Sequence, residues 1–249
     1  MKKILFSLVT LLATLPILSA QTPDSQESQP DRQPVIVTSD LSVKEKVSSV
    51  RIAIQAGGAF RPGKIEAGTD PGWAAYQKKL RWGYSVGADL TWFFTDALGI
   101  GAKFNDIRVS NESQVSLTYE DGSTRAGTLK DRIDIWYAGP LLSYRWLSRT
   151  GRNAFFVNYG LGYLGYQDVG MVIDPAKQAG GTLGLQFELG YDFGITKHLA
   201  AGIDFNMISG TLTHYTLTMN GKDQRIDLDK DEYMGLGHLA LSAGLRYYF

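Results

Sequence analysis

The chain has 249 residues, and its 25 Lys and Arg residues balance 25 Asp and Glu residues, so the formal net charge is zero at pH 7. This balance excludes the strongly basic surface of nucleic-acid-binding proteins, and we expect no nucleic-acid partner. The chain has no cysteine. A disulfide framework and a cysteine-linked lipid anchor are therefore excluded as well.

The first 20 residues have the layout of a secretory signal peptide. Lys2 and Lys3 precede an apolar run that starts at Ile4, and the run ends at the small residues Ser19 and Ala20. A membrane anchor is the alternative, but the run is shorter than the about 20 residues that cross a bilayer. We therefore expect residues 1–20 to be a signal peptide.

Residues 21–50 begin with a stretch rich in Gln, Ser, Asp and Pro. Such a composition buries too little apolar surface to offset the entropy of ordering. We expect 21–50 to be a largely disordered periplasmic segment, followed by a single domain over 51–249.

From residue 51 onward apolar residues alternate with polar or small ones, which is the period of a β-strand. The clearest case is "LRWGYSVGADLTWFF" at 80–94, where every even position is apolar. No window shows helical periodicity over several turns. The alternation predicts strands at about 51–60, 80–94, 98–110, 131–146, 154–166, 179–193, 199–209 and 233–249.

Short connections alternate with long ones between these strands, as in outer-membrane barrels. The long connections are 61–79, 111–130, 167–178 and 210–232. The apolar faces carry large aromatic side chains, and the opposite faces carry glycines and charges. A soluble barrel would need the bulky side chains inside. The sequence therefore predicts an all-β fold, an eight-stranded antiparallel up-and-down transmembrane β-barrel, with small and charged residues filling its lumen.

The last strand, "GHLALSAGLRYYF", alternates Leu245, Tyr247 and Phe249. This ending resembles the C-terminal signature of Gram-negative outer-membrane proteins. With the signal peptide and the alternating strands, the chain resembles small barrels of the OmpX/OmpA-transmembrane-domain type. The resemblance implies a monomer in the outer membrane that contacts outer-membrane lipid and lipopolysaccharide. It also implies that the barrel-assembly machinery reads the last residues. An even strand number places both termini in the periplasm.

Charged residues on the faces predicted to point inward form a candidate lumen network. Its members are Arg81, Asp89, Lys103, Arg145, Glu188, Asp192, Asp204 and Arg246. Because isolated charges are costly in a narrow interior, we expect these side chains to pair and plug the barrel. A narrow channel is the alternative interpretation, although eight strands enclose little more than side chains.

Two long connections contain hairpin-turn dipeptides, Asp121-Gly122 and Asn220-Gly221, between β-prone flanks. These dipeptides favour two-residue turns. We expect the flanking strands to continue beyond the membrane as hairpins. OmpX-like barrels similarly project a sheet outward, which implies a surface protein partner. Solvated loops without a partner are the alternative.

Two further patterns invite a chemical interpretation. His238 and Ser242 share an inward face, and some barrels of this size hydrolyse lipid A. Residues four apart in one strand lie about 13 Å apart and point away from lipid, so we expect no enzymatic activity. Asp227, Asp229 and Asp231 start like a calcium-binding loop, but the required Gly and final Glu are missing. We expect a solvated loop with neither a metal nor a cofactor, and a weak divalent-ion site that bridges to lipopolysaccharide is the alternative.

The first long connection ends in Lys78 and Lys79, near the outer rim of the predicted barrel. Basic side chains at that level can contact lipid phosphates, but an ordinary solvated loop is the default interpretation. The expected function is a structural or surface-interaction (adhesion-type) role. A lipid A deacylase-like enzyme and a narrow channel are the alternatives.

Overall fold

The computed structural model describes residues 48–63, 71–118, 124–171 and 175–249. These residues belong to one compact unit, Lys44–Phe249. The predicted signal peptide, most of the predicted N-terminal segment and the Asp121-Gly122 turn lie outside the described residues.

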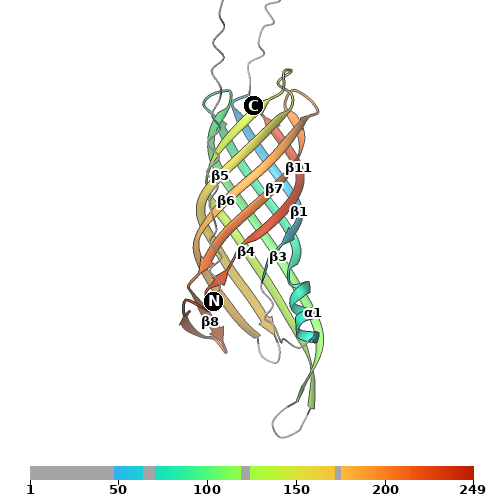
Figure 1. The fold of residues 1–249 in the computed structure, drawn as a ribbon, viewed down its shortest axis with the longest axis vertical. Coiled ribbons are helices and arrows are strands. Elements are labelled where there is room, and N and C mark those ends of the chain that lie inside the picture. Colours follow the sequence, from blue (N-terminus) through green and yellow to red (C-terminus); the bar gives the residue numbers. More distant parts are fainter. Residues whose placement is uncertain (1–47, 64–70, 119–123, 172–174) are drawn as a thin grey trace, which may run out of the picture. The chain divides into compact units, whose positions relative to one another are not determined.

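Eight antiparallel strands form a closed ring (Figure 1). Each strand pairs with its neighbours along the ring, and β1 pairs with both β2 and β11. The ring strands are β1 (Val50–Phe60), β2 (Trp82–Phe93), β3 (Leu98–Thr118), β4 (Thr124–Leu147), β5 (Ala154–Met171), β6 (Pro175–Gly194), β7 (Leu199–Leu212) and β11 (His238–Tyr248). The predicted eight-stranded up-and-down barrel is confirmed.

Three short strands lie beyond the ring. β8 (His214–Met219) pairs with β6 and β9 (Lys222–Asp227), and β10 (Met234–Gly235) pairs with β7. The β3–β4 ladder also continues past the apolar segments 98–110 and 131–146, as far as the Thr118–Thr124 pair, as expected for a projecting hairpin. The apolar alternation stops earlier because the outer part of these strands meets water on both faces, whereas the backbone ladder continues.

The sequence shows no helical periodicity over several turns, and the connection at 61–79 was expected to be a loop, but the short helix α1 (Pro71–Lys79) forms in it. Trp73 and Tyr76 stack on one side of this helix, with ring centroids 5.3 Å apart. Nine residues give too few turns for a visible apolar stripe, so periodicity misses such a helix. Among the described residues, no helix is long and apolar enough to cross a membrane.

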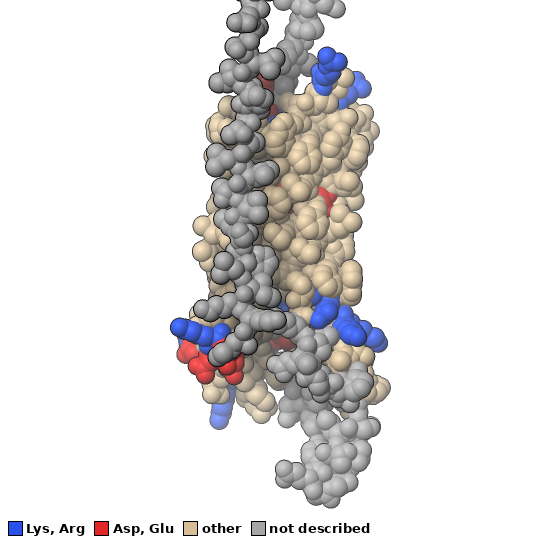
Figure 2. Space-filling model, in the orientation of Figure 1, with Lys and Arg blue, Asp and Glu red and all other residues tan. Residues whose placement is uncertain are grey.

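The outer wall of the barrel is apolar. The even-numbered residues of β2 point outward as predicted, and Trp82 exposes 67% of its surface. Figure 2 shows this wall as a mostly tan band with only small red spots, and Lys and Arg side chains gather at its two ends. Lipid contact explains so much exposed aromatic and aliphatic surface, because acyl chains replace water around the band.

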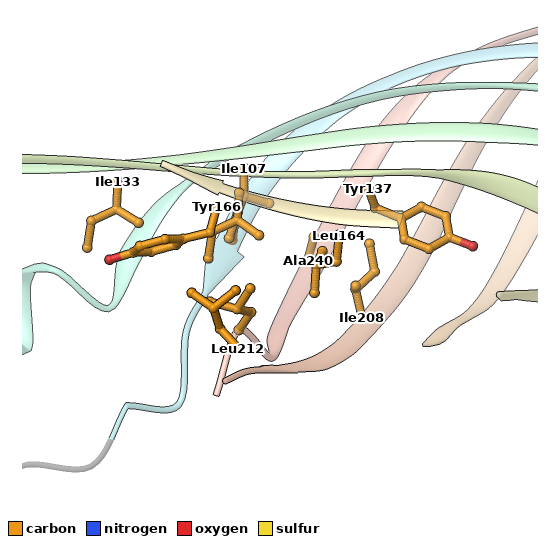
Figure 3. Packing of buried hydrophobic residues seen from close by; sticks show 11 residues of the cluster. Ile107, Ile133, Tyr137, Leu164, Tyr166, Ile208, Leu212 and Ala240 are labelled. Atoms are coloured by element: carbon orange, nitrogen blue, oxygen red, sulfur yellow. The ribbon is translucent and has the colours of Figure 1, made fainter. Parts of the chain in front are cut away.

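The interior differs from the prediction that small and charged residues fill it. Charged and polar side chains fill the half next to the short turns, but large apolar side chains fill the other half (Figure 3). We call this second group the apolar plug, and it comprises Ala59, Ile107, Ile133, Ile135, Tyr137, Leu164, Tyr166, Ile208, Leu212, Leu236 and Ala240. The sequence pattern hides the plug because apolar residues such as Ile135 and Trp136 stand next to each other and face opposite sides.

Glycines make room for the plug inside the ring. A Cβ on Gly160 would lie 2.5 Å from the Tyr137 hydroxyl, and one on Gly139 would lie 2.8 Å from it. The Tyr137 hydroxyl therefore lies over Gly139 of its own strand and Gly160 of β5, where a Cβ would crowd it.

We expect Leu185→Arg, on the outward face of β6, to lower the free energy of unfolding by about 2–4 kcal/mol if the residue lies near the membrane midplane. Leu185 exposes 63% of its surface. Met219→Arg is the matched control, because Met219 is 45% exposed on β8 beyond the ring. Denaturant titration in lipid vesicles measures both. Equal destabilisation by the two variants would contradict the assignment of the lipid-facing wall.

Candidate functional site

A network of ionised side chains fills the lumen near the short turns. We call it the lumen cluster, and its members are Arg51, Asp89, Lys103, Glu188, Asp192, Asp204 and Arg246. All seven side chains are buried. They come from β1, β2, β3, β6, β7 and β11, so the cluster ties together six of the ring strands.

Two arginines bridge carboxylates on different strands. Arg51 places Nη1 2.6 Å from Asp89 Oδ1 and Nε 2.8 Å from Asp192 Oδ2. Arg246 places Nε 3.1 Å from Asp192 Oδ1 and Nη2 2.7 Å from Asp204 Oδ2. Asp192 thus joins both guanidinium groups. A Cβ on Gly202 would lie 2.5 Å from Asp192 Oδ1, so this glycine leaves the space that the pair needs.

Lys103 completes the cluster. Its ammonium group pairs with Glu188 and lies 3.9 Å from Asp89 Oδ2. Asn158 donates an amide hydrogen bond to Glu188, with Nδ2 2.8 Å from Oε1. Because each buried charge has an opposite charge beside it, the cluster offsets the desolvation cost that an isolated charge would carry.

Three arginines stand differently from the sequence interpretation. Arg81 is not in the lumen: β2 begins only at Trp82, and the partly exposed Arg81 side chain donates to the Gly63 carbonyl instead. Arg145 is buried, but Nε and Nη2 each lie 2.9 Å from a backbone carbonyl, those of Asp96 and Ser48. Arg51 was missed. The alternation in "VRIAIQ" puts it in phase with Gln55, but it is the first residue of its predicted strand.

The residues considered for catalysis and metal binding lie apart from one another. His238 and Ser242 are both buried in the lumen, and His238 Nδ1 lies 3.2 Å from the Leu236 carbonyl. Asp227 pairs with Arg225 at 2.9 Å on exposed β9. Within the part of the chain that the structure describes, no group of three His, Cys, Asp or Glu residues is placed to hold a metal ion.

A second polar group lies at the long-loop end and fixes α1. Tyr76 donates to Asp131, with Oη 2.8 Å from Oδ2, and Asn111 donates back to the Tyr76 carbonyl at 3.2 Å. Beside them, Tyr166 donates to Asp168 at 3.2 Å. Burial, and then the neighbouring Asp131 carboxylate, raise the pKa of Asp168 to about 6. The helix is therefore held against β3 and β4 at the mouth of the barrel.

Beyond the ring the strands continue as an open sheet, in the order β3, β4, β5, β6, β8, β9. The φ angles of Asn220 and Gly221 are 51° and 72°, the left-handed conformation that a two-residue hairpin turn requires. Among the described residues, β9 pairs only with β8. β3 pairs with β2 only as far as Arg108. Within the described ranges, the sheet thus has two edges without a neighbouring strand, and α1 contacts one of them at Asn111.

Comparison with solved structures identifies this architecture. A major outer membrane protein from Thermus thermophilus superposes with a TM-score of 0.52 at 11% identity, covering 80% of this chain and 99% of that one. The chain has the fold of small outer-membrane β-barrels. This barrel also matches the outer membrane protein OprG from Pseudomonas aeruginosa, with a TM-score of 0.44, 15% identity and coverage of 81% and 97%. Neisserial surface protein A matches with a TM-score of 0.45, 11% identity and coverage of 80% and 97%.

Sequence comparisons add no closer relative. No protein-family model matches the barrel, and no curated protein matches it by sequence. The structural likeness shows the fold of the chain.

We expect Asp192→Ala to lower the free energy of unfolding by about 3–5 kcal/mol, because Arg51 and Arg246 then each lose a buried partner. Asp227→Ala breaks the exposed pair with Arg225 and is expected to cost less than about 1 kcal/mol. Denaturant titration of the refolded proteins measures the difference. An equal effect of the two variants would mean that the lumen cluster does not hold the ring together.

The raised pKa of Asp168 predicts a pH-dependent stability. Because the folded chain binds this proton more tightly than the unfolded chain does, the contribution is present below about pH 4 and is lost as the pH rises to about 6. The free energy of unfolding of Asp168→Asn, relative to that of the wild type, should therefore rise by about 1 kcal/mol when the pH is raised from 4 to 7. This figure allows for screening at a half-buried site. Asp229→Asn in an exposed loop is the control. A gap between Asp168→Asn and wild type that stays constant with pH would refute the assignment.

Proposed function

We propose that the protein is a non-enzymatic, monomeric outer-membrane barrel that binds a protein partner at the surface through the open sheet at its long-loop end. In this proposal both termini are periplasmic and the long loops face outside. The observation that carries it is the combination of a filled lumen with a sheet that continues past the ring and ends in unpaired edges.

The filled lumen argues against a channel. The lumen cluster occupies one half of the interior and the apolar plug occupies the other. Moving an ion past the plug would strip its water among mostly apolar side chains, which is costly. The interior therefore supports a role in stability, and an interaction surface is expected outside the ring.

Strand edges bind other chains by adding a strand, because the backbone N–H and C=O groups at an edge have no hydrogen-bond partner within the sheet. The β9 edge carries the exposed charges Lys222, Asp223, Arg225 and Asp227. Such charges suppress unspecific edge-to-edge pairing. They favour a partner strand with a complementary charge pattern, which supports binding of a specific partner over non-specific association.

The outward face of β11 supports a second contact, the one made during assembly. Leu245, Tyr247 and Phe249 all point outward, and the Phe249 amide donates to the Val50 carbonyl at 3.0 Å where the ring closes. In our proposal these three side chains form the signal that the barrel-assembly machinery reads before the ring closes.

The functional test removes the β9 edge and leaves the ring intact. We expect replacement of residues 214–227 by a two-residue turn to abolish attachment of expressing cells to a host-cell layer, with surface expression unchanged. Asp229→Asn with Asp231→Asn is the control, since both lie in the same connection outside β8 and β9. Attachment that survives the trimming at full surface expression would leave a purely structural role.

The orientation can be tested because the chain has no native cysteine. We expect a membrane-impermeant maleimide to label Met219→Cys on intact cells and to miss Arg149→Cys in the turn between β4 and β5. Both positions are exposed, so reactivity reports the side of the membrane. Labelling confined to Arg149→Cys would reverse the proposed topology.

A further inference from the structure

The free edge of β9 presents the backbone groups of alternate residues. The Leu228 amide donates to the Thr213 carbonyl at 2.9 Å, one step beyond the β8–β9 ladder. In an antiparallel ladder, each residue whose N–H and C=O groups point to the neighbouring strand is followed by one whose groups point away. The even-numbered residues of β9 therefore bond to β8. Asp223, Arg225 and Asp227 point their backbone groups to the free edge.

The side chains of the same three residues form a row of alternating charge. Residues two apart in a strand share one face of the sheet. Arg225 places Nε 2.9 Å from Asp227 Oδ1, and the Thr218 hydroxyl donates to Asp223 Oδ1 at 2.7 Å. All three charged side chains are exposed. A strand that adds to this edge therefore meets an acidic, a basic and an acidic side chain in turn.

A second copy of β9 complements this row when it runs antiparallel to the first. Residues whose backbone groups point to the shared edge must lie opposite each other. With Gln224 opposite Gln224 of the second copy, Asp223 of each copy faces Arg225 of the other, which gives two pairs of opposite charge. The two adjacent permitted registers place Arg225 or Asp223 opposite itself, and like charges that face each other are destabilising. Registers further out overlap only one end of β9.

The direction of β9 places the second copy on a facing membrane. β8, which carries β9, lies beyond the ring (Figure 1). β6, β8 and β9 form one continuous antiparallel ladder, so β9 keeps the inclined direction of the barrel strands. Two copies in one membrane are related by rotation about the membrane normal, which cannot make an inclined strand antiparallel to its copy. Rotation about an axis that lies between two facing membranes makes the strands antiparallel and brings the two β9 edges together.

We propose that the β9 edge pairs with the β9 edge of a second copy on a facing membrane, with Gln224 at the centre of the contact. The inference rests on the proposed function, because it names one partner of the open sheet. β9 has six residues, so a single contact is short. Many copies on two facing membranes act together, and their combined affinity exceeds that of one contact. Each barrel stays a monomer within its own membrane, and the contact joins cells that both carry the protein.

The test uses the full chain refolded into phosphatidylcholine vesicles, whose clustering is followed by light scattering. Asp223→Arg and Arg225→Asp each turn both pairs between the copies into like-charge pairs. We therefore expect vesicles that carry either variant alone to cluster about tenfold more slowly than wild-type vesicles, because facing like charges suppress association. In a mixture of the two kinds of vesicle, opposite charges face each other again at both pairs, and clustering should return to the wild-type rate. The double variant should cluster with itself and not with the wild type.

Asp229→Arg is the matched control, since it makes the same charge change in the same connection outside β9, and it should cluster as the wild type does. The heat-dependent gel shift of folded barrels shows that each variant has closed its ring. Labelling of Met219→Cys by an impermeant maleimide shows that the β8–β9 hairpin lies outside the vesicles.

Wild-type vesicles that stay dispersed would overturn the proposal, as would a mixture of Asp223→Arg and Arg225→Asp vesicles that does not cluster. Clustering that Asp223→Arg leaves unchanged would overturn it as well. The host-cell assay with the 214–227 replacement separates this outcome from failure of the proposed function. If the replacement abolishes attachment while wild-type vesicles stay dispersed, the open sheet still binds a surface partner, and only the second copy is removed as that partner.

Discussion

The closed ring of backbone hydrogen bonds is the constraint on which the rest of this structure depends. In hydrocarbon, an unpaired amide or carbonyl costs several kcal/mol, and only a sheet without edges satisfies every strand. The pairing of β1 with β11 removes the last edge within the membrane. Closure then decides where each side chain goes, because alternate residues must face either lipid or a narrow lumen.

Because the outer wall is apolar, the polar side chains face the lumen, where they must form hydrogen bonds and ion pairs with one another. The lumen cluster does so with bridging arginines, and Asp192 is shared by two of them. The half next to the long loops is filled by the apolar plug instead. Two interiors of opposite character therefore lie along one barrel, and each closes the passage in a different way. Because the interior serves stability, the surfaces that can bind a partner lie on the outside.

The outside offers two kinds of surface that follow from the same constraint. Above the membrane, closure is no longer required, so the ladder opens into a sheet whose edge strand β9 has no further neighbour among the described residues. At the headgroup level, charged side chains become tolerable again on the outward face, and Arg108 and Asp134 take positions that lower down would be apolar. We propose a protein partner for the first surface.

Most of the fold is readable from the sequence, because the period of two is imposed on every membrane strand by lipid on one side. The alternation in 80–94 gave the outward face of β2 directly, and Asn220-Gly221 gave the β8–β9 turn, since that dipeptide tolerates the left-handed conformation. Arg51 and the two halves of the lumen were not readable. Which inward residues meet depends on strand register and tilt, which no single strand encodes.

Local sequence pattern alone determined the membrane strands, their apolar outward faces and the Asn220-Gly221 turn, since each of these depends on neighbours along the chain. Tertiary structure alone decided the partners of the charges. Arg81 and Asp89 share one strand face in the sequence, yet Asp89 pairs with Arg51 inside the ring, whereas Arg81 lies beside α1 at the rim. The physical reason is that ion pairing acts through space over a few ångströms, and closure of the ring brings residues more than 100 positions apart, such as Arg51 and Asp192, into that range.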